Sequence, residues 1–158
     1  MKALLVIDIQ TRFIKDANAF EEERFIKVVN SSIEVFQKKG DLVIYVHHLK
    51  GDVLPGTPGW EFDERIIMDN KAPFIWKSKG NAFDGTELKS ILDKHKIKEI
   101  TLCGLVTQNC IRSTGIGCVE EGYKTILLKN GTTNWTDNPQ KTIDEVEREL
   151  ESLGVIIK

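Results

Sequence analysis

The chain has 158 residues, of which 41% are hydrophobic and 29% are charged. This length is enough for one folded domain, and the composition excludes a disordered, fibrous or disulfide-dense protein. The 22 basic and 24 acidic residues give a formal net charge of −2, so nothing favours a nucleic-acid or anionic-membrane partner. We expect one domain over residues 1–158 that binds a small-molecule substrate.

The hydrophobic run at the start of the chain is short, because it stops at Asp8. It is too short for a signal-peptide core, and no run approaches the roughly 20 apolar residues that a bilayer span requires. The three cysteines, Cys103, Cys110 and Cys118, show no C-x-x-C spacing. An odd number of such cysteines is typical of reduced thiols. These features predict a cytoplasmic protein without a membrane partner.

Runs rich in Val, Ile and Leu alternate with amphipathic stretches, which predicts strands alternating with helices. In chain order the predicted elements are a strand at 3–8, a helix at 21–39, strands at 42–48 and 74–76, a helix at 86–95, a strand at 99–104, a helix at 106–121, a strand at 124–130, a helix at 139–153 and a strand at 155–158. This alternation predicts a three-layer α/β/α domain with a parallel sheet of about six strands.

One long segment, residues 49–72, fits no regular element. It contains several turn-forming residues, among them Gly51, Pro55 and Pro58. Irregular segments of this length in compact domains are usually functional, so we expect this one to cover the site.

Chemically useful side chains follow three of the predicted strands. Asp8 ends the first strand, Lys77 follows 74–76, and Cys110 lies a few residues beyond the strand that ends at Gly104. Ligands of parallel α/β sheets bind beyond the carboxyl ends of the strands, so an acid, an ammonium and a thiol are expected at one edge.

The same three residues have both structural and catalytic interpretations. Asp8 at the tip of a buried strand needs a partner, which Lys77 can supply, but a carboxylate that only accepts loop amides is equally compatible with its position. Lys77 and a helix N-terminus are expected to depress the pKa of Cys110 below the roughly 8.5 of a free thiol. Cys103 and Cys118 are interpreted as small buried apolar residues.

Three segments resemble the motifs of the isochorismatase-like cysteine hydrolases, the superfamily that includes nicotinamidases and carbamoylsarcosine amidases. The segments are ALLVIDIQTRF, WKSKGNAFDGTEL and CGLVTQNCIRSTGIGCVEEGY, and PGTPGWEF in the long loop extends the similarity over nearly the whole chain. The resemblance implies a Rossmann-like sheet of order 3-2-1-4-5-6 and the catalytic residues Asp8, Lys77 and Cys110. It also implies a cis peptide bond between Leu105 and Val106, with the backbone amides of Val106 and Cys110 forming an oxyanion hole.

The cysteine indicates the reaction, because superfamily members that hydrolyse isochorismate lack it. We expect Cys110 to attack an amide or related carbonyl carbon and form a thioester, with Asp8 moving the proton. Gln10, Phe13 and Trp60 are predicted to contact the substrate, with orientation of Asp8 as the alternative role of Gln10. The alternative is a non-catalytic or thiol redox-sensing protein on the same fold.

No metal and no organic cofactor are predicted. Nicotinamidases, which this chain resembles, bind a metal through an Asp-x-His and further histidines after the second strand. Here only His47 and His48 lie nearby, which is too few ligands, and we interpret them as polar strand-end residues while leaving a metal role open. The chain also lacks a G-x-G-x-x-G or phosphate-binding loop. Because relatives are commonly dimers or larger, we expect a homo-oligomer.

Overall fold

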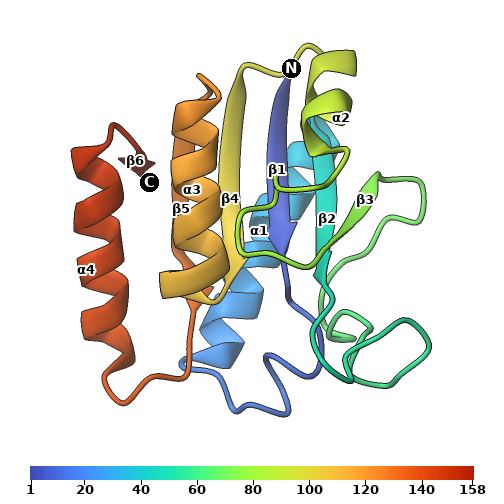
Figure 1. Cartoon of the computed structure of the whole chain (residues 1–158), viewed down its shortest axis with the longest axis vertical. Coiled ribbons are helices and arrows are strands. Elements are labelled where there is room, and N and C mark those ends of the chain that lie inside the picture. Colours follow the sequence, from blue (N-terminus) through green and yellow to red (C-terminus); the bar gives the residue numbers. More distant parts are fainter.

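A six-stranded parallel sheet forms the centre of the protein (Figure 1). The computed structural model describes residues 1–158. The strands are β1 (Lys2–Ile7), β2 (Leu42–His48), β3 (Phe74–Lys77), β4 (Glu99–Leu105), β5 (Lys124–Thr133) and β6 (Ile156–Ile157). Their spatial order is β3-β2-β1-β4-β5-β6, and every neighbouring pair runs parallel. The predicted fold class and strand order are therefore confirmed.

Helices cover both faces of the sheet. The helix α1 (Glu22–Lys39) lies behind the sheet in Figure 1, whereas α2 (Leu88–Lys94) and α3 (Arg112–Glu120) lie in front of it. The fourth helix, α4 (Pro139–Ser152), packs with α2 and α3 into the same hydrophobic core. None of the helices combines the length and apolar character that crossing a membrane requires.

The sheet separates two hydrophobic cores, and β2 contributes to both. Val43 and Tyr45 pack into the core under α1, whereas Ile44 and Val46 pack into the core under α2, α3 and α4. This is the period-two alternation of a strand that is buried on both faces. Because the alternation continues to the end of β2, His47 is directed to the α1 face and His48 to the opposite face.

Two elements differ from the sequence prediction by more than two residues at one end. The strand predicted to end at Asn130 continues to Thr133. A bulge interrupts the β4–β5 pairing between Leu102 and Gly104, and Asn130 and Gly131 lie in this bulge instead of ending the strand. The helix predicted over 106–121 starts as a π-helical turn, Thr107–Ile111, before α3 begins. π-Helical turns are rare and occur frequently at functional sites.

The long loop runs largely along the α1 side of the molecule. Its backbone hydrogen-bonds with the segment after β1, through Asp63 N–H to Ile9 O at 2.9 Å and Thr11 N–H to Glu61 O at 2.8 Å. Phe62 is buried in the core under α1. The expectation that this loop covers the site is therefore wrong for most of its length, because its apolar side chains complete the core on the other face.

Candidate active site

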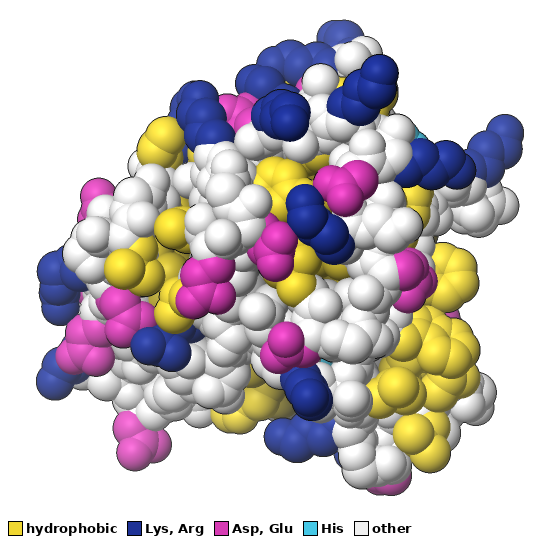
Figure 2. All heavy atoms as spheres, turned by 45° about the horizontal axis from the view of Figure 1, so that its top comes forward, with side chains coloured by type: hydrophobic (Ala, Val, Ile, Leu, Met, Phe, Trp, Pro, Cys, Tyr) yellow, Lys and Arg dark blue, Asp and Glu magenta, His cyan; other side chains and the backbone are white.

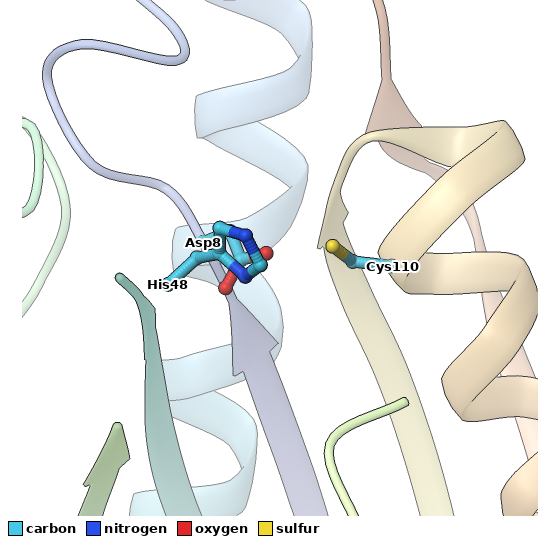
Figure 3. Close-up of side chains that lie close together, drawn as sticks. All are labelled: Asp8, His48 and Cys110. Carbon is cyan, nitrogen blue, oxygen red and sulfur yellow. The ribbon is translucent and has the colours of Figure 1, made fainter. Parts of the chain in front are cut away.

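Four polar side chains converge beyond the carboxyl ends of the strands. Asp8 directly follows β1, His48 ends β2, Lys77 ends β3, and Cys110 lies in the π-helical turn after β4. In Figure 3 the Cys110 sulfur points across the sheet edge toward Asp8 and His48. We call these four residues the Lys77 cluster. The strand-end argument from the sequence thus placed Asp8, Lys77 and Cys110 at one edge, and the structure brings them together.

Lys77 is the centre of the cluster. Its Nζ atom lies 2.9 Å from Asp8 Oδ2, 2.8 Å from His48 Nδ1 and 3.1 Å from Cys110 Sγ. The residue is only 2% exposed, so these contacts replace water. A lysine ammonium has three N–H donors and no acceptor, so each of its protons is directed at one partner.

His48 completes this arrangement as a neutral acceptor. Burial, with a smaller contribution from the positive charges of Lys77 and Lys50, lowers the pKa of His48 from 6.5 to about 4. The ring is therefore uncharged near neutral pH, and the lone pair on Nδ1 accepts a hydrogen bond from Lys77. From the sequence, His48 was interpreted as a polar strand-end residue with a metal role left open, and its contact with Lys77 was not expected. The alternation of side chains along β2 is the sequence feature that could have placed His48 on the same face of the sheet as Lys77.

Asp8 has an unusual backbone and an unused acceptor. Its φ of 56° lies in the left-handed region, which is uncommon for a residue other than glycine and occurs often at functional sites. Burial raises the pKa of its carboxyl group, and the charge of Lys77 opposes this shift. The Oδ1 atom is buried without a hydrogen-bond partner, so one carboxylate oxygen remains free to accept a proton.

The pKa of Cys110 differs from the sequence prediction. The thiol is 8% exposed, and burial together with the negative charge of Asp8 raises its pKa to about 12, although Lys77 acts in the opposite direction. The prediction of a depressed pKa is wrong, because it counted the lysine and the helix terminus but not the desolvation and the carboxylate. Cys110 is therefore a thiol near neutral pH, and it lies beside the buried Asp8–Lys77 ion pair.

The turn that carries Cys110 is held by close contacts with neighbouring strands. Gly104, at the end of β4, has a φ of 128°, and a Cβ atom there would lie 2.0 Å from the carbonyl oxygen of Ile7. The next peptide bond, Leu105–Val106, is cis, as the resemblance implied. The Thr107 hydroxyl donates a hydrogen bond of 3.1 Å to the carbonyl of Thr133 in β5. Glycine is thus required where β4 passes β1.

The loop after β3 is fixed on α3 in a similar way. The Thr114 hydroxyl accepts a hydrogen bond from Ala82 N–H at 3.0 Å and donates one to the carbonyl of Gly80 at 3.3 Å. A Cβ atom at Gly117 would lie 2.6 Å from the Asn81 side chain, so the loop and the helix are in close contact. These contacts hold the strand end that carries Lys77 near the turn that carries Cys110.

A cavity of about 390 Å³ opens beside Cys110, and we call it the Cys110 cavity. Its volume falls within the range of small-molecule sites. Its walls combine apolar and polar residues. The lining residues are Asp8, Phe13, His48, Lys50, Ser78, Gly80, Leu105, Val106, Asn109, Cys110, Ser113 and Trp135.

Of the three residues predicted to contact the substrate, only Phe13 lines this cavity. Gln10 is fully buried and holds the backbone of His48, accepting from its N–H at 2.7 Å and donating to its carbonyl at 3.2 Å. Trp60 stacks on His47 with ring centroids 4.7 Å apart, on the α1 face of the sheet. Gln10 therefore positions the end of β2, and Trp60 lies in a separate cavity.

The cluster also contains a possible set of metal ligands. One ligand atom each from Asp8, His48 and Cys110 lies within 4.8 Å of the other two. Lys77 Nζ, however, contacts all three residues at 2.8 to 3.1 Å and already supplies the positive charge there. A metal ion would have to displace a buried ammonium, so the donor set does not fit a metal while Lys77 is in place.

Comparison with known proteins identifies the class. The isochorismatase domain model matches residues 2–147, so the chain belongs to the isochorismatase family. A crystal structure of the pyrazinamidase of Pyrococcus horikoshii in complex with zinc has a TM-score of 0.88 and 25% identity, covering 99% of this chain and 98% of that one.

Curated relatives support this assignment. The chain is 30% identical over 141 residues to the uncharacterized isochorismatase family protein YddQ of Bacillus subtilis. This similarity covers 85% of this chain and 78% of YddQ. It is 29% identical over 134 residues to a streptothricin hydrolase of Streptomyces noursei, covering 80% of this chain and 48% of that protein. The chain thus spans about half the length of the streptothricin hydrolase.

Proposed function

We propose that this protein is a cysteine-dependent hydrolase of a small amide or related C–N bond, with Asp8, Lys77 and Cys110 as its catalytic residues. The observation that carries the proposal is the single buried ammonium that contacts a carboxylate and a thiol together, at 2.9 and 3.1 Å. The family assignment supports it, because hydrolases of amides are among the relatives.

The proton transfer follows from the charges of the cluster. The resting site contains one negative charge, on Asp8, next to one positive charge, on Lys77. When the Cys110 proton moves to Asp8, the negative charge moves to sulfur, and Lys77 still neutralises it. The pKa of Cys110 is raised because loss of its proton to water would place a second negative charge in the buried site next to Asp8. Transfer to Asp8 leaves the net charge of the site unchanged and therefore avoids this cost.

The reaction then proceeds in two steps. Cys110 Sγ bonds to the carbonyl carbon, the C–N bond breaks, and Asp8 returns its proton to the departing amine. Water, deprotonated by Asp8, then attacks the thioester carbon, the C–S bond breaks to release the acid, and Asp8 passes the proton to Sγ to restore the thiol. Val106 and Cys110 both line the cavity, and we assign their backbone amides to the developing oxyanions.

Ammonia release from a panel of small amides tests this proposal. We expect Cys110→Ser to keep the fold and to lose turnover on the order of a thousandfold or more, because the serine hydroxyl is a poorer nucleophile in the same position. Cys118→Ala is the matched control, because this cysteine is buried in the core and lines no part of the cavity. Full activity of Cys110→Ser would overturn the mechanism.

Iodoacetamide separates the hydrolase from its alternative, a non-catalytic or redox-sensing thiol protein. Both predict labelling of Cys110, but only the hydrolase predicts ammonia release that labelling abolishes. Because burial raises the pKa of Cys110 to about 12, we expect the labelling rate to increase up to pH 9 without a plateau, as measured by mass spectrometry. A midpoint near pH 7 would show that the thiolate forms readily in the resting enzyme.

Three further expectations remain predictions: a single domain over residues 1–158, a cytoplasmic location and assembly into a homo-oligomer. The exposed side chains of Phe74 and Trp76 on β3, at the edge of the sheet, favour assembly.

A further inference from the structure

We propose that Lys50 forms an anion-binding subsite in the Cys110 cavity, so that the preferred substrate is a small amide that also carries a carboxylate. This inference rests on the proposed hydrolase function. Lys50 lines the cavity together with Cys110 and His48. It comes from the short part of the long loop that does reach the cavity.

The charge of Lys50 is not neutralised within the protein. The structure contains eleven ion pairs between charged side chains, and Lys50 takes part in none of them. Its nearest acidic neighbour in sequence, Asp52, is held by Arg12 through two hydrogen bonds of 3.0 and 3.2 Å. The pairing of Asp52 with Arg12 leaves Lys50 as a cation without a partner.

The remaining charges of the cavity cancel. Asp8 pairs with Lys77 at 2.9 Å, and His48 is neutral. The other polar side chains of the wall, Ser78, Asn109 and Ser113, carry no charge. The cavity therefore has an excess of one positive charge. Its field reaches the cluster, because Lys50 contributes to the lowered pKa of His48. A ligand with one negative charge would complement this site.

Lys50 is exposed, but hydrogen bonds fix the backbone from which its side chain extends. Gln10 holds both the N–H and the carbonyl of His48, and Leu49 N–H donates to the carbonyl of Lys77 at 2.8 Å. Lys50 then begins a tight turn that Val53 N–H closes with a hydrogen bond of 2.8 Å to the Lys50 carbonyl. The side chain thus starts from a defined point beside the cluster.

The test compares two amides of the same chain length, anionic succinamate and neutral succinamide. First we measure how strongly each one protects Cys110 from iodoacetamide, which requires binding but not turnover. We expect succinamate to protect at a concentration about tenfold lower, a difference that one charge-assisted contact can supply. In Lys50→Gln this preference should disappear, and in Lys50→Glu it should reverse.

Lys79→Gln is the matched control, because Lys79 is exposed on the neighbouring loop and does not line the cavity. It should keep the preference. Equal protection by the two amides in the wild type, or an unchanged preference in Lys50→Gln, would overturn the subsite.

Ammonia release from the same two compounds then separates the two proposals. A charge preference in protection without ammonia release from these two compounds or from any amide of the panel would support the subsite and contradict the hydrolase. Ammonia release with a succinamate-to-succinamide ratio that Lys50→Gln does not change would support the hydrolase and overturn the subsite.

Discussion

Two cavities open near the end of β2, and each is lined by one of two adjacent histidines. His48 lines the Cys110 cavity, whereas His47 lines a larger cavity of about 950 Å³, which we call the aromatic cavity because Tyr45, Trp60 and Trp76 also form its wall. Figure 2 shows a broad hydrophobic area on the lower right of the molecule. The exposed large hydrophobic side chains include Leu54, Met68, Phe74 and Trp76.

Burial acts on both histidines in the same direction, but their partners differ. It lowers the pKa of each to about 4. His48 Nδ1 accepts from Lys77 at 2.8 Å, whereas His47 Nδ1 is buried without a hydrogen-bond partner, and its ring packs against Trp60 and Phe62. A shifted pKa therefore does not mark a functional residue by itself. The polar partner that His48 has, and His47 lacks, distinguishes the two sites.

Removing the ammonium from the cluster should have the largest effect. Lys77→Met leaves the Asp8 carboxylate buried and unpaired, so we expect unfolding to become easier by about 3 to 5 kcal/mol and ammonia release to be lost. Denaturant unfolding and the ammonia assay measure these changes. The double variant Lys77→Met with Asp8→Asn should recover most of the stability and none of the activity. If the double variant were as unstable as the single one, the ion pair would not be the cause.

The comparison of the cavities also shows how far the sequence predicts the site. Apolar runs located the strands, and the rule that ligands bind at strand ends selected Asp8, Lys77 and Cys110. Both inferences depend only on the residues within and next to each strand, and these can be identified in the sequence. Trp60 was assigned to the substrate because aromatic residues wall many small-molecule sites, but the sequence does not reveal on which face of the sheet its loop packs.

The missed features depend on contacts between distant segments. Gln10 was expected at the substrate and instead binds His48, 38 residues away. The pKa of Cys110 depends on burial and on Asp8, 102 positions earlier in the chain, and its direction was misjudged because only Lys77 and the helix terminus were counted. The π-helical turn and the bulge in β5 have no simple periodic signature in the sequence.

Changing the acceptor at His48 should have an intermediate effect. His48→Phe leaves one N–H of Lys77 without a partner in a buried site, so we expect the ammonium to shift and kcat to fall about tenfold or more. His48→Gln offers a carbonyl oxygen as acceptor and should recover part of the loss, which a purely steric role would not predict. Equal kcat in the Phe variant and the wild type would show that Lys77 needs only Asp8 and Cys110.

The smallest expected effect concerns His47 and appears only in acid. Because burial lowers the folded-state pKa of His47 to about 4 from 6.5, unfolding takes up a proton between these values, and stability is lost as the pH falls through this range. After allowance for partial solvation of the ring, we expect about 1 kcal/mol less stability at pH 5 than at pH 7 from this residue.

His47→Phe keeps an aromatic ring against Trp60 but cannot titrate. Its unfolding free energy should therefore fall less between pH 7 and pH 5 than that of the wild type, while His48 contributes equally to both proteins and cancels in the difference. Identical losses in the two proteins would mean that His47 is already neutral in the unfolded chain or protonates within the fold, and the aromatic cavity would then not be the source of acid sensitivity.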